Sequence, residues 1–396
     1  MKKIVIIGAG IIGLSLALEL LKRGHKNVIL LEKENEIAKH QSSRNSGVMH
    51  AGLYYKPESL KSKLCRDGIN LMKTYCNKNS IKWDECGKIV IANNSLEENR
   101  LSELFERGQK NNLKGIQKIK SNQISKLEPY VKANSAIFVP EESIVNYKEV
   151  ANSYLNQILS YGGSVKYFSK VKKIINKNSR KLIYLENEEV FDADIIISST
   201  GVYSDKLAEM MGIDINRQKI IPFRGEYYLL KDEFKYLVKG LIYPVPNPSF
   251  PFLGVHLTKM IDGNVEAGPN AVLALAREGY SWRIINFREF VESITYKGIR
   301  KFILKYPLTT FGEISRSLSK GLFVDSLKKL IPDLNESMFY KGNSGIRAQL
   351  MNLKGDLIQD FDIKTSGNLI SILNAPSPAA TSSLAIAKYV ADYADL

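Results

Sequence analysis

Two apolar runs near the start of the chain have the pattern of strands buried on both faces. Lys3–Ile7 and “NVILL” (27–31) consist mainly of consecutive Ile, Val and Leu residues without polar alternation. Between them, the apolar residues of “LSLALELL” recur at helical spacing, and this segment closes at Gly24. The pattern predicts a strand–helix–strand unit at the start of the chain.

Strand and helix patterns continue to alternate as far as about residue 215. The expected strands are “KIVIAN” (88–93), “SVKYFSKVKKII” (164–175) and Ile195–Ser199, and the expected helices are 97–110 and 147–161. From about Arg217 to Gly321, short strands separated by Pro, Gly and Asn are typical of an antiparallel sheet, with helices from about Trp282 to Tyr306. A buried strand, a proline-containing turn and a helix that we expect to begin near Ala379–Thr381 end the sequence.

Length and composition indicate an ordinary globular protein with more than one domain. The chain has 396 residues, of which 44% are hydrophobic and 24% charged, and one core rarely serves so long a chain. The formal net charge of +15 allows nucleic acid, an anionic membrane or an acidic ligand as partner. The lysines are scattered along the chain, however, so the charge alone selects none of these partners.

The cysteines and the apolar runs exclude several other classes. Cys65, Cys76 and Cys86 are odd in number and form no C-x-x-C pair, which argues against a disulfide framework or a zinc site and favours a reducing compartment. No apolar run approaches the ~20 residues of a spanning helix. The N-terminus begins like a secretory signal, but glycines interrupt it and no cleavage site follows.

The glycines between the first strand and helix form a dinucleotide-binding fingerprint. Gly8 permits a tight turn, Gly10 lets a pyrophosphate approach the backbone, and Gly13 lets the helix pack closely on the strand. The helix N-terminus at Ile11 and Ile12 offers N–H groups to phosphates. Glu32 ends the second strand at the distance from the turn where an acid accepts hydrogen bonds from a ribose, which favours FAD or NAD over NADP. One such fingerprint is present, so we expect one dinucleotide.

The loop “HQSSRNSGVMHAG” (40–52) follows at the carboxyl edge of the predicted sheet, where ligands bind in open α/β folds. Ser42, Ser43, Asn45 and Ser46 can donate hydrogen bonds to phosphates or to a ring carbonyl. Gly47 lets the chain lie against a flat ring, which places His50 beside that ring.

Several further motifs make the chain similar to one family of flavoproteins. They are distributed along nearly the whole chain: “GAGIIGLSLALELLKRG”, “HQSSRNSGVMHAGLYYKPESLK”, “PFRGEYYLL”, “LIYPVPNPSFPFLGVHLTKMIDGNVEAGPNAV”, “SGIRAQ” and “LNAPSPAATSSLAIA”. They resemble the L-2-hydroxyglutarate dehydrogenase/oxidase branch of the D-amino-acid-oxidase-like FAD oxidoreductases. The resemblance implies non-covalent FAD and oxidation of L-2-hydroxyglutarate to 2-oxoglutarate by hydride transfer to flavin N5. The electrons then pass to a quinone or another acceptor, or to O2.

The resemblance also implies the domain organisation and the cofactor site. We expect an α/β protein in which residues 1–87, 142–215 and 322–396 form a Rossmann-like FAD-binding domain, and residues 88–141 and 216–321 form an antiparallel-sheet α+β substrate domain. The residues expected at the cofactor are Gly8, Gly10, Ile11, Ile12, Gly13, Glu32, Lys33, Gln41, Ser42, Ser43, Asn45, Ser46, Gly47, Val48, Val171, Thr200, Gly201, Ser204, Gly345, Arg347, Pro376, Ser377, Ala379, Ala380 and Thr381.

Six residues are candidates for the chemistry, and no metal is expected. Oxidising an alcohol requires a base for the hydroxyl proton, and histidine titrates near working pH. His50 is therefore the first candidate base and His256 its rival. Arg224 and Arg347 are candidates for binding carboxylates because a guanidinium matches a carboxylate bidentately. Tyr228 and Tyr243 are candidate hydroxyl donors, although tyrosine more often belongs to a core or an interface.

Alternative functions stay open. Another enzyme of the same fold could act on an amino acid or glycerol 3-phosphate, because fold does not determine the substrate. A tRNA-modifying flavoprotein or a non-catalytic flavin protein are further alternatives, although no clustered basic tract favours nucleic acid. We expect a cytoplasmic protein, and its positive charge suggests peripheral contact with the anionic inner face of the cell membrane.

Overall fold

The first predicted strand lies near the centre of a six-stranded sheet. In the computed structural model, which describes residues 2–177, 180–247 and 252–396, the strand order of this sheet is β20 (Asp362–Ser366), β21 (Leu369–Asn374), β13 (Ile195–Ser198), β1 (Ile4–Ile7), β2 (Val28–Leu31) and β9 (Ser164–Lys166). The strands are parallel except for β20, which is antiparallel to β21. Burial on both faces explains their unbroken apolar runs.

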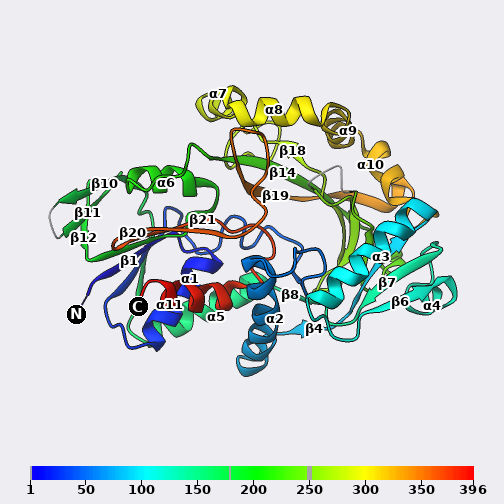
Figure 1. Ribbon diagram of the computed structural model, residues 1–396, viewed down its shortest axis with the longest axis horizontal. Coiled ribbons are helices and arrows are strands. Elements are labelled where there is room, and N and C mark those ends of the chain that lie inside the picture. The colour runs from blue at the N-terminus through cyan, green and yellow to red at the C-terminus, as the bar shows by residue number, and fades with distance from the viewer. Residues whose placement is uncertain (1, 178–179, 248–251) are drawn as a thin grey trace.

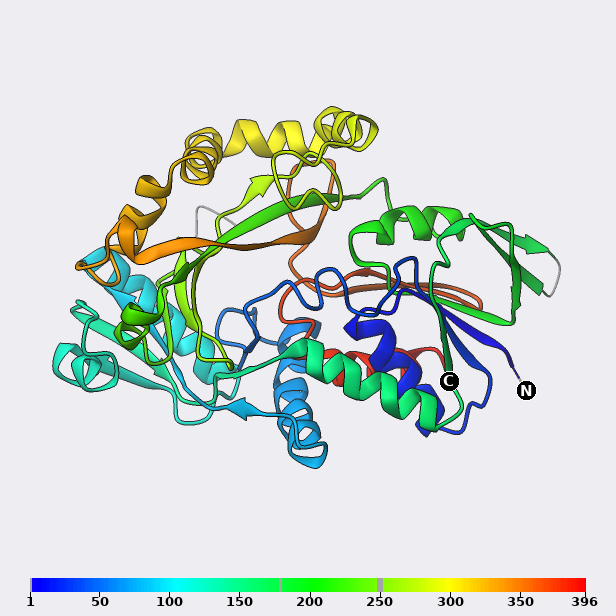
Figure 2. The ribbon, with the colours of Figure 1, turned by 180° about the vertical axis from the view of Figure 1, so that it is seen from behind.

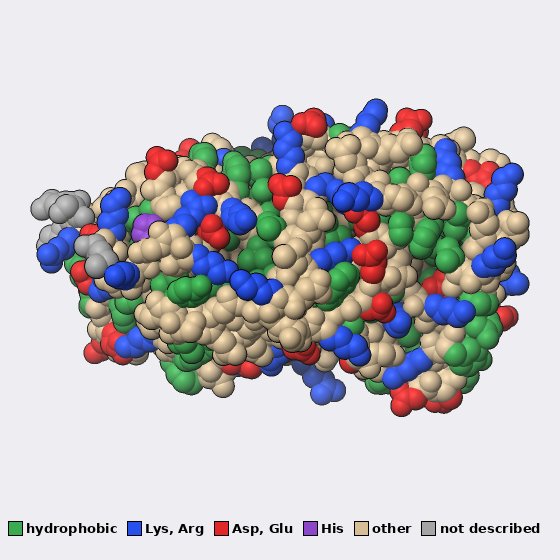
Figure 3. Space-filling model, turned by 90° about the horizontal axis from the view of Figure 1, so that it is seen from below, with side chains coloured by type: hydrophobic (Ala, Val, Ile, Leu, Met, Phe, Trp, Pro, Cys, Tyr) green, Lys and Arg blue, Asp and Glu red, His purple; other side chains and the backbone are tan. Residues whose placement is uncertain are grey.

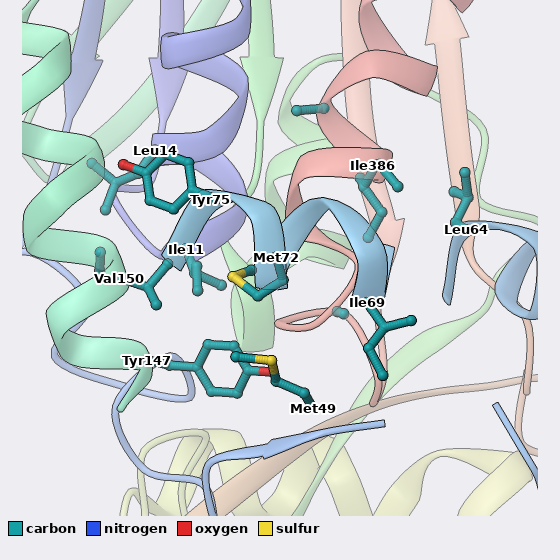
Figure 4. Close-up of a cluster of buried hydrophobic side chains, with 14 of the residues drawn as sticks. Ile11, Leu14, Met49, Leu64, Ile69, Met72, Tyr75, Tyr147, Val150 and Ile386 are labelled. Atoms are coloured by element: carbon teal, nitrogen blue, oxygen red, sulfur yellow. The ribbon is translucent and has the colours of Figure 1, made fainter. Parts of the chain in front are cut away.

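Three helices cover one face of this sheet, α1 (Ile11–Lys22), α5 (Tyr147–Ser160) and α11 (Ser383–Tyr393), and α2 (Leu60–Lys78) packs against α11 (Figure 1). Figure 4 shows how their buried side chains interlock: Ile11 and Leu14 of α1, Met72 and Tyr75 of α2, Tyr147 and Val150 of α5, and Ile386 of α11. The other face packs against α6 (Ser204–Met210) and a small sheet of β10 (Val171–Lys177), β11 (Arg180–Leu185) and β12 (Val190–Ala193).

A second large sheet lies beside the first (Figures 1 and 2). Its order is β18 (Val272–Leu273), β14 (Lys219–Leu230), β17 (Val265–Gly268), β16 (His256–Lys259), β15 (Leu241–Pro244), β5 (Lys88–Ala92), β7 (Ser135–Val139) and β6 (Gln117–Lys120), and β19 (Phe339–Met351) also pairs with β14. These pairs are antiparallel except β15 with β5. The observed fold class is therefore the predicted one, α/β with a mainly antiparallel second sheet.

Shorter elements complete the described chain. A small sheet joins β3 (Val48–Met49), which belongs to the loop 40–52, with β8 (Ser143–Val145) and β4 (Trp83–Asp84). Helices α3 (Ser95–Lys110) and α4 (Ser121–Leu127) accompany β5, β6 and β7, whereas α7 (Phe287–Thr295), α8 (Lys297–Lys305), α9 (Pro307–Leu318) and α10 (Lys320–Leu327) form a row along one edge of the molecule (Figure 1). None of the described helices is both long and apolar enough to cross a membrane.

Three details differ from the sequence-based expectations. The segment 164–175 forms two strands in different sheets, β9 and β10, because the chain turns at Phe168, whose φ is +54°. β19 lies in the range expected for the FAD-binding domain but pairs along its length with β14 of the second sheet. Helix α11 begins at Ser383, so Ala379–Thr381 lie in the preceding turn. Residues 248–251, within one quoted motif, lie outside the described residues.

Candidate active site

The glycine turn after β1 has the close contacts expected of a dinucleotide fingerprint. Gly8 has a φ of +100°, and a Cβ there would lie 2.7 Å from the Ser199 carbonyl oxygen. A Cβ on Gly13 would lie 2.0 Å from the Gly8 oxygen, so only glycine lets α1 approach the strand. Gly10 is the N-cap of α1, and the Ser42 hydroxyl accepts a hydrogen bond from Ile11 N at 2.9 Å. The next N–H groups of the helix have no intrahelical partners and can bind phosphate.

The acid that ends β2 is held by the backbone. Glu32 is buried; its Oε2 accepts from Ala9 N at 2.8 Å and its Oε1 from Glu34 N at 3.0 Å. A carboxylate has about four acceptor positions, so Glu32 keeps lone pairs for a ribose. Lys33, also expected at the cofactor, is ion-paired with Glu34 at 2.5 Å and Glu278 at 2.8 Å.

The loop 40–52 is shaped partly by its own side chains. Asn45 Nδ2 donates to the carbonyls of Gln41 and Ser42, both at 3.0 Å, and its Oδ1 accepts from Gly47 N at 3.0 Å. Gly47 has a φ of +69°, and a Cβ there would lie 2.5 Å from the Val145 carbonyl oxygen. The loop therefore rests on β8, with Asn45 maintaining its turn.

Both large sheets contribute to one cavity of about 1830 Å³. It is larger than the roughly 300–1,000 Å³ of a typical small-ligand pocket, so a dinucleotide and a small acid can share it. The expected residues that line it are Gly8, Gly10, Ile11, Ile12, Glu32, Lys33, Gln41, Ser42, Asn45, Ser46, Gly47, Val48, His50, Val171, Thr200, Gly201, Ser204, Tyr243, His256, Gly345, Arg347, Pro376, Ser377, Ala379, Ala380 and Thr381. Gly13, Ser43 and Arg224 are not among its lining residues.

The prediction that Arg224 lies in the pocket is wrong. Its side chain is fully buried, pairs with Glu226 Oε1 at 3.1 Å, and lies over the Trp282 ring at 4.3 Å. Successive side chains of a strand point to opposite faces. Gly225 and Tyr227 of β14 line the cavity, so Arg224 and Glu226 point away from it. By the same alternation, Tyr227 and not Tyr228 faces the cavity.

His50 is joined to a buried ion pair. Its Nδ1 lies 3.4 Å from Glu142 Oε2, and Lys88 Nζ donates to Glu142 Oε1 at 2.5 Å. Glu142 and Lys88 are both fully buried. Burial works to raise the pKa of Glu142, but Lys88 and His50 outweigh it and hold that pKa at about 2. Glu142 is therefore ionised at neutral pH.

His256 lies across the cavity in a different environment. Its Nδ1 is 2.9 Å from the Gly254 carbonyl oxygen, which accepts only if Nδ1 carries the proton. Its ring stacks on Tyr243 with centroids 3.8 Å apart. Burial, with a smaller contribution from the charge of Arg347, lowers the pKa of His256 to about 3. The imidazole is therefore neutral at neutral pH and can accept a hydrogen bond through Nε2.

Arg347 brings positive charge to the same cavity from β19. One N–H donates to the Asn270 carbonyl at 3.0 Å, and the guanidinium carbon lies 5.3 Å from the centre of the Phe252 ring. Burial lowers the pKa of Arg347, but a guanidinium stays protonated in proteins. Within the described ranges, no carboxylate lies within 4.0 Å of its guanidinium nitrogens. The arginine is therefore suited to bind an anion from the cavity.

A model of the FAD dependent oxidoreductase family matches residues 3–393. The chain belongs to this family. Among its relatives, the L-2-hydroxyglutarate dehydrogenase of Indibacter alkaliphilus is 47% identical over 393 residues, or 99% of this chain and 98% of the relative. The mitochondrial L-2-hydroxyglutarate dehydrogenase of Nematostella vectensis is 41% identical over 411 residues, or 99% and 90%.

A solved flavoprotein structure has the same fold. The dithionite reduced L-α-glycerophosphate oxidase of Mycoplasma pneumoniae with FAD bound matches with a TM-score of 0.81 at 21% identity, covering 100% of this chain and 95% of that one. The predicted α/β flavoprotein fold and the FAD cofactor are thus confirmed.

The residues present fit the cofactor of an FAD dependent oxidoreductase. The glycine turn and the free N–H groups of α1 suit the pyrophosphate, and Glu32 suits the ribose. Gly345 approaches the opposite loop so closely that a Cβ would lie 2.4 Å from the Arg44 carbonyl oxygen. The individual contacts with FAD stay predictions.

The sequence analysis did not identify four residues that lie near the two histidines and Arg347: Tyr54, Lys88, Glu142 and Tyr227. Glu142 gave no signal, because “PEES” reads as an ordinary polar turn. Lys88 opens an apolar strand, and this charge in a buried run was the one visible cue. The Tyr54 hydroxyl is buried without a hydrogen-bond partner in the described part of the chain, and the Tyr54 and Tyr243 rings lie 4.8 and 5.0 Å from Lys88 Nζ.

Proposed function

We propose that the protein oxidises L-2-hydroxyglutarate to 2-oxoglutarate. The observation that carries this proposal is an arginine, Arg347, that has no ionic partner among the described residues and lies in the same cavity as two histidines, His50 and His256. A dicarboxylate with a hydroxyl beside one carboxylate matches this set of groups. Relatives of 47% and 41% identity over nearly the whole chain bear the name of this dehydrogenase.

The cavity residues divide the work of orientation and proton transfer. Bound FAD supplies a two-electron acceptor for the hydrogen on C2. Arg347 binds a carboxylate of the substrate, and its planar fork fixes the orientation of that carboxylate. The buried Tyr54 hydroxyl and the neutral His256 offer further polar contacts, while Tyr243 supports the His256 ring.

His50 is the better candidate for the base that accepts the hydroxyl proton. A general base is most effective when its pKa lies near the operating pH. The pKa of His256, at about 3, is too low for that task, whereas the carboxylate beside His50 stabilises a protonated ring. Arg224 has no part in this scheme because it lies outside the cavity.

Anaerobic mixing with single substrates tests the assignment. L-2-hydroxyglutarate should bleach the visible flavin absorbance, whereas D-2-hydroxyglutarate, glycerol 3-phosphate and amino acids should react far more slowly. Bleaching by glycerol 3-phosphate or an amino acid alone would favour the alternative enzymes of this fold. A flavin that none of these compounds reduces would favour a non-catalytic protein.

The distribution of charge argues against an RNA substrate. On the face shown in Figure 3, Lys and Arg side chains are interspersed with Asp and Glu instead of forming a continuous tract. RNA-binding proteins usually gather their basic residues on one surface, often with aromatic platforms. The excess of positive charge therefore needs another explanation.

That explanation is a membrane surface formed by α7–α10. Large apolar side chains that are exposed there are Ile284, Ile285, Phe287, Ile294, Ile303, Leu304, Leu308, Phe311, Leu318 and Leu322. Between residues 283 and 305, the exposed charged side chains are all basic: Arg283, Arg288, Lys297, Arg300, Lys301 and Lys305. Apolar side chains beside a basic face are characteristic of helices that lie in an anionic lipid interface. We place this surface against the cytoplasmic face of the membrane, where a quinone can take the electrons.

Flotation with vesicles tests the membrane contact. The protein should float with vesicles of phosphatidylglycerol and phosphatidylcholine at low salt, and less with phosphatidylcholine alone. Leu308→Ser with Phe311→Ser removes two side chains worth about 1.5–3 kcal/mol each when buried, so binding should weaken roughly 100-fold or more. Leu96→Ser, at an exposed leucine on α3, is the matched control. Equal binding of both variants would exclude this surface.

A further inference from the structure

Two buried polar atoms, one on His50 and one on Glu142, face one another at the wall of the cavity. His50 Nδ1 and Glu142 Oε2 are 3.4 Å apart, and neither has a hydrogen-bond partner among the described residues. The other carboxylate oxygen, Oε1, accepts from Lys88 Nζ at 2.5 Å and from Ala51 N at 3.1 Å. The carboxylate is thus held on one side and presents its free oxygen to the imidazole.

We infer that Glu142, anchored by Lys88, is a positioning residue that keeps the proton of neutral His50 on Nδ1 and leaves Nε2 as the free base. The inference rests on the proposed role of His50. An ionised carboxylate only accepts hydrogen bonds, so Nδ1 must be the donor. The same negative charge stabilises the ring once it has taken up the proton of the substrate.

The other groups around His50 cannot replace this effect. Lys88 lies beyond the carboxylate, and His256 and Arg347 line the same cavity as neutral or cationic groups. The His50 backbone is used elsewhere, since its N–H donates to Thr381 Oγ1 at 3.2 Å and its carbonyl oxygen accepts from Cys65 Sγ at 3.1 Å. Glu142 is therefore the group that sets the tautomer.

Glu142→Gln should reverse the tautomer instead of merely loosening the ring. The amide oxygen will take the Oε1 position, because Lys88 Nζ and Ala51 N are both donors. The amide NH2 then faces His50 Nδ1 and makes it an acceptor, so the ring proton moves to Nε2. The base is then blocked, and we expect flavin reduction at neutral pH to slow roughly 100-fold or more with little change in substrate affinity.

Nitrogen NMR of the holoenzyme labelled with ¹⁵N-histidine tests this without turnover. Native His50, assigned with His50→Ala, should show a protonated Nδ1 and an unprotonated Nε2, and Glu142→Gln should show the opposite. Glu141→Gln is the matched control, because Glu141 pairs with Arg66 at 2.9 Å and does not contact His50.

Two outcomes would overturn the inference: native His50 protonated on Nε2, or a Glu142→Gln enzyme that keeps the native tautomer. Glu142→Asp keeps the charge and should keep the native tautomer with partial activity; if Glu142→Gln does not fold, loss of the native tautomer in Glu142→Asp overturns the inference. If the tautomer reverses as expected but L-2-hydroxyglutarate does not reduce the native flavin, the proposed function fails and the positioning role stands.

Discussion

Arg347 should control the affinity for the substrate, and the structure gives the size of the effect. One of its five N–H donors is used by the Asn270 carbonyl, so about four remain for a carboxylate. A hydrogen bond to a charged group contributes about 1.5–3 kcal/mol. Losing a bidentate pair in Arg347→Met should therefore cost at least about 3 kcal/mol, which is a roughly 100-fold loss of affinity. Arg347→Lys keeps the charge but loses the planar fork of the guanidinium. We therefore expect a loss of about 1.5 kcal/mol of binding free energy, which is a roughly tenfold loss of affinity.

Anaerobic stopped-flow reduction of the flavin separates binding from chemistry. The dependence of the rate on L-2-hydroxyglutarate concentration gives Kd, and its plateau gives the limiting rate. We expect Kd to rise in the order native, Lys, Met, with equal flavin content in all three proteins. Arg180→Lys, at an exposed position of β11, controls for the substitution itself. A Kd in Arg347→Met within about threefold of the native value would remove this residue from the binding site.

Further substitutions test the cofactor site, the packing and the pocket. Gly10→Val puts a branched side chain where the pyrophosphate should lie, so the purified protein should lose its bound flavin, measured by visible absorbance per chain. Arg277→Met leaves the buried Asp205 without the guanidinium that pairs with it at 2.6 Å. This should lower the free energy of unfolding by about 3–5 kcal/mol and lower the thermal midpoint. Tyr54→Phe removes a buried hydroxyl that has no hydrogen-bond partner in the described ranges, so stability should hold or rise while Kd for the substrate increases about three- to tenfold, as for one hydrogen bond. Removing the FAD should lower the thermal midpoint. Adding FAD at 100 times its Kd should restore about 2.7 kcal/mol of the free energy of unfolding, which scanning calorimetry can measure.

The dinucleotide unit could be predicted because its signals are local. A buried strand, three glycines and an apolar helix each follow from near-neighbour geometry, and Glu32 lies at the distance from the turn that the cofactor requires. The same reasoning failed for Arg224, where both strand faces are buried and the apolar pattern does not show which face meets the cavity. It also joined β9 and β10, because strand-forming residues continue through the turn at Phe168.

The residues that position His50 could not be predicted from the sequence, for a different reason. Glu142 comes from the turn between β7 and β8 and Lys88 from β5, so tertiary folding alone brings them to the loop that carries His50. Neither residue has a motif around it. Such distant pairs become visible only when the burial and the atoms of each group are known.

The arrangement of β21 has a consequence for biosynthesis. This strand inserts between β20 and β13, and the turn behind it, residues 375–381, supplies one wall of the cavity. The glycine turn is translated more than 350 residues before this part of the wall. A nascent polypeptide that stops before about residue 381 cannot enclose FAD, so premature termination ahead of this turn should yield a colourless product.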